Sequence, residues 1–122
     1  MVNLSDDSPE LVLNFPELLA RVDNDRDLLR ELLGLFKEES SNLLGSLKQA
    51  VSHQDMERVQ MTGHTLRGML ANLSAERATA AASRLEEVGR GGDKAELSNA
   101  LLAFESEMAI LLPNVDRYLH DV

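Results

Sequence analysis

The sequence predicts an all-α fold, namely an antiparallel four-helix bundle with a short additional N-terminal helix across one end. Aromatic residues make up 3% of the chain and tryptophan is absent, whereas strands are enriched in aromatic and β-branched side chains. Apolar residues recur three and four positions apart over four long segments, which is the period of an amphipathic helix. A length of 122 residues is sufficient for one hydrophobic core, so we expect a single domain.

The N-terminal part of the chain is expected to hold a tail and one short helix. Residues 1–8, MVNLSDDS, are polar and unpatterned and predict a flexible tail. The domain is then expected over residues 9–122. A short helix is predicted near FPELLARV, where Pro16 suits the first helical turn. Asn24 can cap the next helix, and Asp27 lies at the reciprocal position three residues later.

The second and third helices are each predicted from one apolar stripe. The second runs from about Asp25 to Val51, and the third from about Met56 to Leu73, with Asp55 as its cap. The stripe of the second helix comprises Leu29, Leu32, Leu33, Phe36, Ser40, Leu43, Leu47 and Val51. The stripe of the third helix comprises Met56, Val59, Gly63, Leu66, Leu70 and Leu73.

The fourth and last helices are separated by GRGGD, the clearest stop in the sequence. Ser74 can cap the fourth helix, and Gly89 suits a left-handed helix end. Asp93 with Glu96 forms a D-x-x-E start for the last helix, in which Pro113 predicts a kink or an early end. The inward face of the fourth helix comprises Ala78, Ala81, Ala82, Leu85 and Val88. That of the last helix comprises Leu97, Leu101, Phe104, Met108, Leu111, Val115 and Leu119.

Composition excludes several classes of function. A net charge of −9 argues against nucleic acid, whose phosphates would be repelled. The chain has no cysteine, which excludes disulfides, zinc–thiolate sites and thiol catalysis. No apolar run approaches the roughly 20 residues needed to cross a bilayer, and no charged-then-apolar leader opens the chain. We therefore expect a cytoplasmic protein, or a cytoplasmic piece of a larger one, without membrane contact by this domain.

One histidine of the third helix, His64, is predicted to stand in solvent. A rotation of about 100° per residue places it roughly 130° from the centre of the apolar stripe. The sequence shows no second histidine at metal-ligand spacing and no adjacent carboxylate to orient the ring, so no metal site is expected. The surface neighbours of His64, three, four and seven residues away, are Gln60, Met61, Arg67, Gly68 and Ala71.

A glycine in the middle of a helix costs about 1 kcal/mol relative to alanine, so Gly68 requires a reason. Without a side chain at this position another protein can approach the imidazole of His64. Arg67 would place a positive charge where an anion on the ring would sit. A neutral, exposed imidazole can act as a nucleophile, but a convex helix face has no pocket, and a partner must complete the active site. His53 and His120 fit the plainer interpretation of solvated surface histidines.

The stretch HTLRGMLANLSA closely resembles the H-x-L-K-G-(small)-(small)-x-N-(apolar)-G-A signature of histidine-containing phosphotransfer (HPt) domains. LLARVDNDRDLLRELLGLFKEES and SRLEEVGRGGD are also similar to HPt domains, in particular those at the C-terminal end of bacterial hybrid sensor kinases. The resemblance implies phosphorelay signalling, in which a phosphoryl group is accepted from a phospho-aspartate and passed to another receiver aspartate. It implies His64 as the acceptor through Nε2, Arg67 as the stabiliser of the phosphoryl group, and Gly68 as the residue that keeps access open.

Besides the arginine at position 67, three positions depart from this signature. Met69 and Leu70 replace small residues, and Ser74 replaces a glycine. Arg67 replaces the usual lysine, which preserves charge but not shape. The helix phase predicts that Leu70 is buried and that Met69 lies at the edge of the core. These two replacements therefore affect packing against the neighbouring helices.

The resemblance also implies partners. Receiver domains of response regulators are expected to dock on Gln60, Met61 and Ala71 around His64, with a strip of the second helix, and a hybrid sensor kinase is a further candidate partner. The chain is expected to bind no cofactor, to have no kinase activity of its own and to be a monomer. Mg²⁺ is expected on the receiver. The parent could be a membrane-bound sensor kinase.

A second hypothesis is a helical adaptor that binds a receiver or kinase domain without carrying phosphate. The joint presence of His64, Arg67 and Gly68 favours phosphotransfer, since a pure adaptor has no need of an open histidine. A dimeric helical scaffold is a remote third alternative, because the sequence indicates no leftover apolar face.

Overall fold

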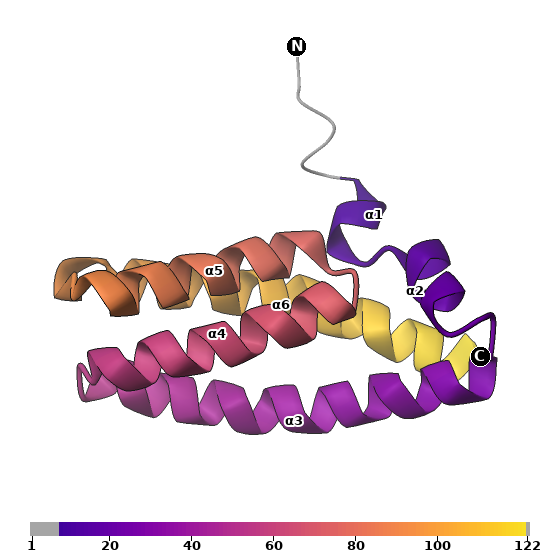
Figure 1. The fold of residues 1–122 in the computed structure, drawn as a ribbon, viewed down its shortest axis with the longest axis horizontal. Coiled ribbons are helices and arrows are strands. Elements are labelled where there is room, and N and C mark those ends of the chain that lie inside the picture. The colour runs from indigo at the N-terminus through magenta and orange to yellow at the C-terminus, as the bar shows by residue number, and fades with distance from the viewer. Residues whose placement is uncertain (1–7, 122) are drawn as a thin grey trace, which may run out of the picture.

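The computed structural model describes residues 8–121, with no account of the side chain of Asp121. Over this range the protein is all-α, and none of these residues forms a strand, as the composition predicts (Figure 1). No helix of this part of the chain is long and apolar enough to cross a membrane. The elements are α1 Pro9–Val12, α2 Phe15–Arg21, α3 Arg26–Ser52, α4 Met56–Asn72, α5 Glu76–Gly91, the 3₁₀ helix η2 Lys94–Glu96 and α6 Leu97–Asp121.

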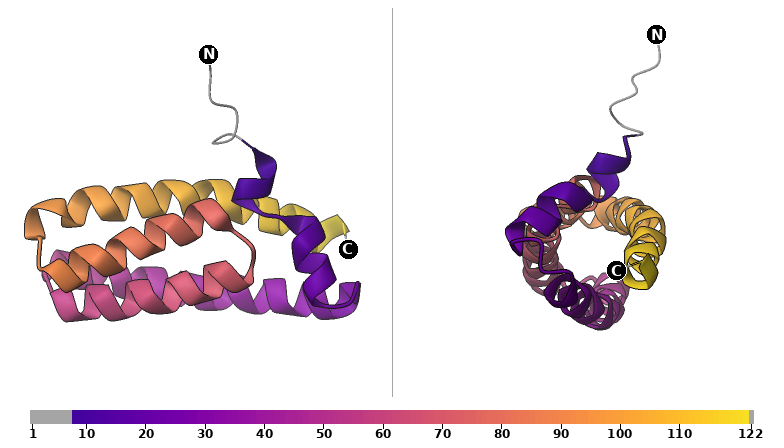
Figure 2. Two further views of the ribbon diagram at one scale, coloured as in Figure 1. Left: turned by 45° about the horizontal axis from the view of Figure 1, so that its top comes forward. Right: turned by 90° about the vertical axis from the view of Figure 1, so that its right-hand side faces the viewer.

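The four long helices form an antiparallel bundle in which each packs against two others. α4 contacts α3 and α5, and α6 closes the ring by contacting both α5 and α3. The two short helices α1 and α2 lie across one end of this ring, as the two views in Figure 2 show. The predicted bundle with a short helix across one end is therefore confirmed.

The helix α1 is an addition to the predicted elements. It is a single turn that begins at Pro9, and the backbone carbonyl of Ser8 accepts a hydrogen bond from the backbone N–H of Leu11. Ser8 alone of the predicted tail 1–8 falls within the described residues. Val12 and Leu13 are buried, which ties this turn to the core.

The core is built from the predicted stripes, with one exception on α3. Leu32 was expected inside but is 41% exposed, because it lies at the edge of the stripe that Leu29, Leu33 and Phe36 define. Burying one leucine side chain contributes about 2 kcal/mol, so these stripes supply much of the stability. The leucines with no exposed surface are Leu29, Leu33, Leu47, Leu66, Leu70 and Leu85.

The sequence predicted Asn24 as the N-terminal cap of α3, but in the structure this cap is Asp25. The Asp25 side chain accepts a hydrogen bond of 3.0 Å from the backbone N–H of Leu28. Asn24 instead has a φ of 62° and forms part of a left-handed turn. An aspartate that accepts from the first helical turn also complements the helix dipole. The predicted cap of α4, Asp55, is confirmed, since it accepts from the backbone N–H of Arg58.

Ser74 does not cap α5. Its φ is 60°, a left-handed conformation, and the residue before the first turn of α5 is Ala75. This conformation explains why the HPt signature has a glycine at the position of Ser74. The Ser74 hydroxyl instead donates a hydrogen bond of 2.8 Å to Glu17 Oε1, which ties α2 to the α4–α5 turn.

α5 ends at Gly91, inside the predicted stop GRGGD, but the left-handed residue that follows it lies three positions beyond the predicted one. Gly89 is buried inside the helix, and the left-handed residue is Gly92, whose φ is 70°. Asp93 precedes the 3₁₀ turn η2, so α6 itself begins only at Leu97. The expected helix end at Gly89 is therefore wrong, because this glycine serves helix packing.

The helix α6 continues through Pro113, so the predicted early end is wrong. A proline removes one backbone hydrogen bond, but contacts beyond it offset this loss. Val115 is fully buried, and the ring of Tyr118 stacks on Phe15 of α2 with centroids 3.9 Å apart. Packing of the last turns thus outweighs the local penalty of the proline.

Candidate functional site

Two glycines allow the backbones of α4 and α5 to pack directly against each other. A Cβ atom at Gly63 would lie 2.8 Å from the backbone nitrogen of Glu86. A Cβ atom at Gly89 would lie 2.5 Å from the backbone nitrogen of Gln60. Both separations are shorter than real side-chain carbons show, so glycine at these positions sets the close packing of α4 on α5.

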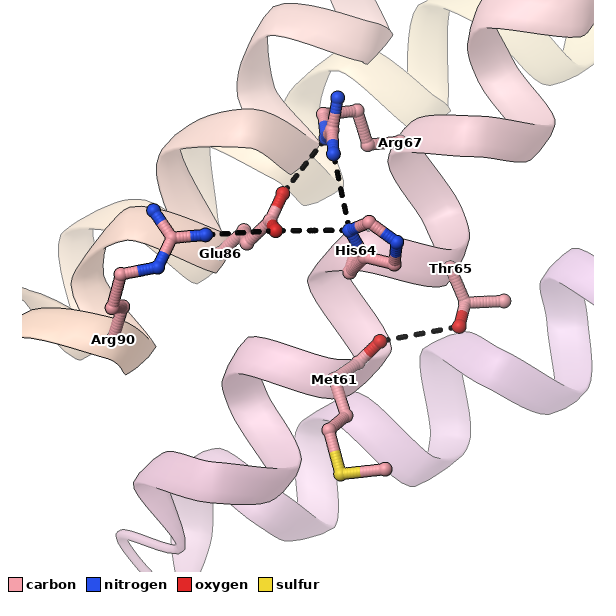
Figure 3. Close-up of polar contacts among 6 residues, drawn as sticks. All are labelled: Met61, His64, Thr65, Arg67, Glu86 and Arg90. Atoms are coloured by element: carbon pink, nitrogen blue, oxygen red, sulfur yellow. Dashed lines mark hydrogen bonds and ion pairs between the residues drawn. The ribbon is translucent and has the colours of Figure 1, made fainter.

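This close approach brings the side chain of Glu86 onto the imidazole of His64 (Figure 3). Glu86 Oε2 lies 2.9 Å from His64 Nδ1. The His64 side chain is 64% exposed, as the helix phase predicts, whereas that of Glu86 is 9% exposed. The expectation that no carboxylate lies beside the ring is wrong, because this carboxylate comes from α5, 22 residues further along the chain.

Two arginines hold the carboxylate of Glu86. Arg67 Nε donates to Oε1 at 2.7 Å, and Arg90 Nη2 donates to Oε2 at 3.0 Å. Removal from water acts to raise the pKa of Glu86, but the hydrogen bonds from His64 and Arg67 outweigh it. The pKa of Glu86 is therefore below its usual range, and the group is an ionised carboxylate at neutral pH.

The guanidinium of Arg67 lies on the Nδ1 side of the His64 ring. Its Nη2 is 3.0 Å from Nδ1, while its Nε contacts Glu86. The other ring nitrogen, Nε2, points away from Glu86 in Figure 3. The role of Arg67 in stabilising a phosphoryl group stays a prediction, and in this structure its guanidinium is paired with Glu86.

The remaining residues of the predicted docking surface lie around His64 with unequal exposure. Met61 is 62% exposed, and Gly68 and Ala71 are exposed as well. Gln60 is half-buried because Gly89 packs on its backbone. Apart from its own helix, no heavy atom of the described chain lies within 4 Å of the place where a Cβ of Gly68 would be.

An apolar strip on α3 lies beside this surface. Leu28, Leu32 and Leu35 are all at least 40% exposed. Leu32 and Leu35 line a shallow groove, and Met69 and Asn72 of α4 line it as well. The expectation that no apolar face is left over is therefore wrong. The groove is lined by Leu18, Leu32, Leu35, Phe36, Glu39, Met69, Asn72 and Leu73.

Sequence reasoning missed Glu86 and Arg90. A signal for Glu86 was present, because it lies on the inward stripe of α5 together with Ala82, Leu85 and Gly89, all of which are buried. A charged residue at a buried position is expected to have a partner. Arg90 follows one turn later on the same helix, where it reaches Glu86.

Comparisons with known proteins agree with this fold. The family model described as Hpt domain matches residues 31–120. No curated protein matches the chain. The crystal structure of histidine-containing phosphotransfer protein B (HptB) from Pseudomonas aeruginosa PAO1 is similar in fold, with a TM-score of 0.85 and 23% identity. That likeness covers 91% of this chain and 96% of the other. Because the family model matches most of the chain, the chain belongs to the Hpt domain family.

Proposed function

We propose that this chain accepts a phosphoryl group from the phospho-aspartate of a receiver domain onto Nε2 of His64 and passes it to another receiver aspartate. Membership in the Hpt family supports a phosphotransfer role in a phosphorelay, with receiver domains as the class of partner. Hpt domains are phosphocarriers rather than kinases, and the proposal assigns no kinase activity to this chain.

The observation that carries the proposal is the orientation of His64. Its Nδ1 faces Glu86, while Nε2 points away from that carboxylate and the side chain is mostly exposed. Gly68, one turn along α4, leaves open space beside the ring. A nucleophilic nitrogen on a convex helix face suits an acceptor that is reached by another protein.

The proposed transfer is an in-line displacement at phosphorus. The bond between Nε2 and phosphorus forms as the bond between phosphorus and the aspartate oxygen breaks, and the electron pair leaves with the aspartate carboxylate. The receiver brings Mg²⁺ held by its own acidic residues, so this chain supplies the nucleophile and its positioning. Transfer to a second receiver is the reverse of the same step.

The proposed docking surface extends from α4 to α3. Met61, Gly68 and Ala71 supply the exposed part of α4, and Leu32 and Leu35 supply apolar contact area on α3. Such a patch, with apolar residues beside a charged site, is typical of a protein interaction surface. The proposal takes the chain as a monomer that meets one receiver at a time.

The test is phosphoryl transfer from a labelled, Mg²⁺-loaded phospho-receiver. Label that moves to the wild type, is acid-labile and alkali-stable, and is absent from His64→Gln supports a phosphohistidine carrier. His53→Gln is the matched control, since it removes another exposed histidine and should be labelled normally. Binding of a receiver without any transfer of label would overturn the proposal and favour the adaptor.

A further inference from the structure

We infer that Glu39 of α3 selects the receivers that this chain binds, because its carboxylate requires a lysine or arginine on the partner surface that covers it. Glu39 lines the shallow groove of Leu32 and Leu35, beside the proposed docking surface. The inference rests on the proposed function, and it concerns the choice of receiver rather than the transfer of the phosphoryl group.

Glu39 is the one charged side chain among the described residues that line this groove. Six of the other seven lining residues are apolar, and the seventh is Asn72. A receiver that covers the groove with apolar side chains therefore also removes water from the carboxylate. The apolar part of the groove offers contact area to any receiver, so the discrimination between receivers falls to Glu39.

No residue between positions 8 and 121 forms an ion pair or a hydrogen bond with the Glu39 carboxylate. The basic residues that flank it on α3 are engaged on the opposite side of the helix. Lys37 pairs with Asp116 of α6, and Lys48 pairs with Glu105 of α6. The carboxylate is exposed and keeps its full capacity to accept hydrogen bonds from a partner.

The helix neighbours of Glu39 supply no cation either. On a helix surface, the side chains three and four residues away are the ones within reach. For Glu39 these are Leu35, Phe36, Asn42 and Leu43. A positive charge opposite this carboxylate must therefore come from another molecule.

Glu39 lies level with the phospho-acceptor along the bundle axis. α3 and α4 run antiparallel side by side (Figure 1), and Arg58 of α4 donates a hydrogen bond of 2.9 Å to Ser46 of α3. About two turns from this contact, Glu39 on α3 comes level with Thr65 on α4. Thr65 follows His64 in the chain and lies on the side of it away from Glu86 (Figure 3). A receiver that reaches His64 can therefore cover Glu39 as well.

The two sides of His64 consequently carry opposite charge. On the α5 side, Arg67 and Arg90 outnumber Glu86, and on the α3 side Glu39 stands without a cation. A receiver is complementary when its acidic phosphorylation site faces His64 and one of its basic residues lies toward α3. Charge complementarity of this kind fixes the orientation of a partner and suppresses wrong partners.

The selection arises from the cost of a mismatch. An exposed ion pair contributes little to affinity, so a matched receiver gains only modestly from the contact. A receiver without a basic residue at this place leaves the carboxylate covered and unpaired, and one with an acidic residue there repels it. Both mismatches disfavour the wrong partner more than the matched pair favours the right one.

The first test compares two neighbouring glutamates of α3. Glu38 lines a different groove, between α3 and α6, so Glu38→Lys makes the same charge change away from the docking surface. With a phospho-receiver that labels the wild type, Glu39→Lys should lower the transfer rate about tenfold or more, and Glu38→Lys should leave it near that of the wild type. Glu39→Gln should lower the rate less and should weaken its dependence on salt.

Phosphoramidate, a small phosphoryl donor that needs no receiver, shows whether the change lies in docking. All three variants should be phosphorylated by it at the rate of the wild type, because Glu39 and Glu38 are exposed and neither touches His64. Equal transfer from the receiver to Glu39→Lys and Glu38→Lys would overturn the inference. So would an equal loss of the rate with phosphoramidate, which would mean a damaged site.

The second test is a charge swap measured by calorimetric binding of the Mg²⁺-loaded, unphosphorylated receiver. Each exposed lysine and arginine of that receiver is replaced by glutamate in turn. One replacement should weaken binding to the wild type and restore binding to Glu39→Lys, with no such rescue for Glu38→Lys. If no replacement restores binding to Glu39→Lys, the carboxylate does not face a basic residue and the inference fails.

The outcomes separate the inference from the proposed function. A receiver that binds with this charge preference and never transfers label leaves the inference standing while the proposed function fails. Transfer of label that is indifferent to the charge at position 39 leaves the proposed function standing while the inference fails.

Discussion

Gly63 contacts the backbone of Glu86 so closely that a side-chain carbon at Gly63 would lie 2.8 Å from its amide nitrogen. This contact determines how far the α5 carboxylate stands from the imidazole on the next residue of α4. The glycine that sets the helix packing thus comes from α4, and the ionised carboxylate that this packing positions comes from α5.

Gly63→Ala should destabilise the fold by about 1–3 kcal/mol, because a methyl group here forces the two helix backbones apart. Gly45→Ala on α3 is the matched control, since no neighbour outside its own helix lies within 4 Å of the added methyl among the described residues. That variant should gain up to about 1 kcal/mol from helix propensity. Urea unfolding gives both values, and a Gly63→Ala variant as stable as Gly45→Ala would contradict the close packing.

Gly68→Gln should impair transfer from a receiver and leave the fold intact. The added side chain occupies the open space beside His64, while glutamine favours helix more than glycine does. The rate with phosphoramidate should stay near that of the wild type, because a small donor needs less room. Normal transfer from a receiver to a folded Gly68→Gln would show that this glycine is not needed for access.

Ser74→Gly should be more stable than Ser74→Ala by about 1 kcal/mol. Both changes remove the hydrogen bond to Glu17, but only glycine adopts the φ of 60° without strain. Thermal unfolding of the two variants measures the difference directly. Equal melting temperatures would mean that the left-handed turn at this position carries no strain.

Acid should weaken the attachment of α2 through Glu17. The hydrogen bond from Ser74, followed by that from Arg21, holds the pKa of Glu17 below its usual range. A lowered pKa in the folded state means that the stabilisation is present above the usual glutamate value, about 4, and is lost as the pH falls through the folded pKa. The stability difference between the wild type and Glu17→Gln should therefore shrink from pH 7 to pH 3. A difference that does not change with pH would contradict this assignment.

The long helices could be predicted from sequence because their apolar stripes are continuous. The predicted limits of α3 differ from the observed ones by one residue at each end. Those of α4 differ by one residue at the C-terminal end only. Local signals were less informative where one residue type has two uses. Gly89 and Gly92 both suit a helix end, and only the presence of α4 against Gly89 distinguishes packing from termination.

The site was only partly predictable for a related reason. The helix phase places His64 in solvent without knowledge of any other helix. The contact with Glu86 depends on the distance between α4 and α5, which no spacing along either helix reveals. Ser74 shows the same limit, since a serine at a helix start is ordinarily a cap and becomes a left-handed residue here because of the turn it completes.

The pairing of one carboxylate with two guanidiniums also shapes the electrostatic field of the molecule. Arg67 and Arg90 outnumber Glu86, so this cluster of three side chains has a net charge of +1 on a chain whose net charge is −9. If His64 accepts a phosphoryl group, as proposed, the dianionic group would be attracted to this cluster and repelled by much of the remaining surface. Encounters are thereby biased toward the productive orientation before any contact forms, and this bias should weaken as added salt shortens the range of the field.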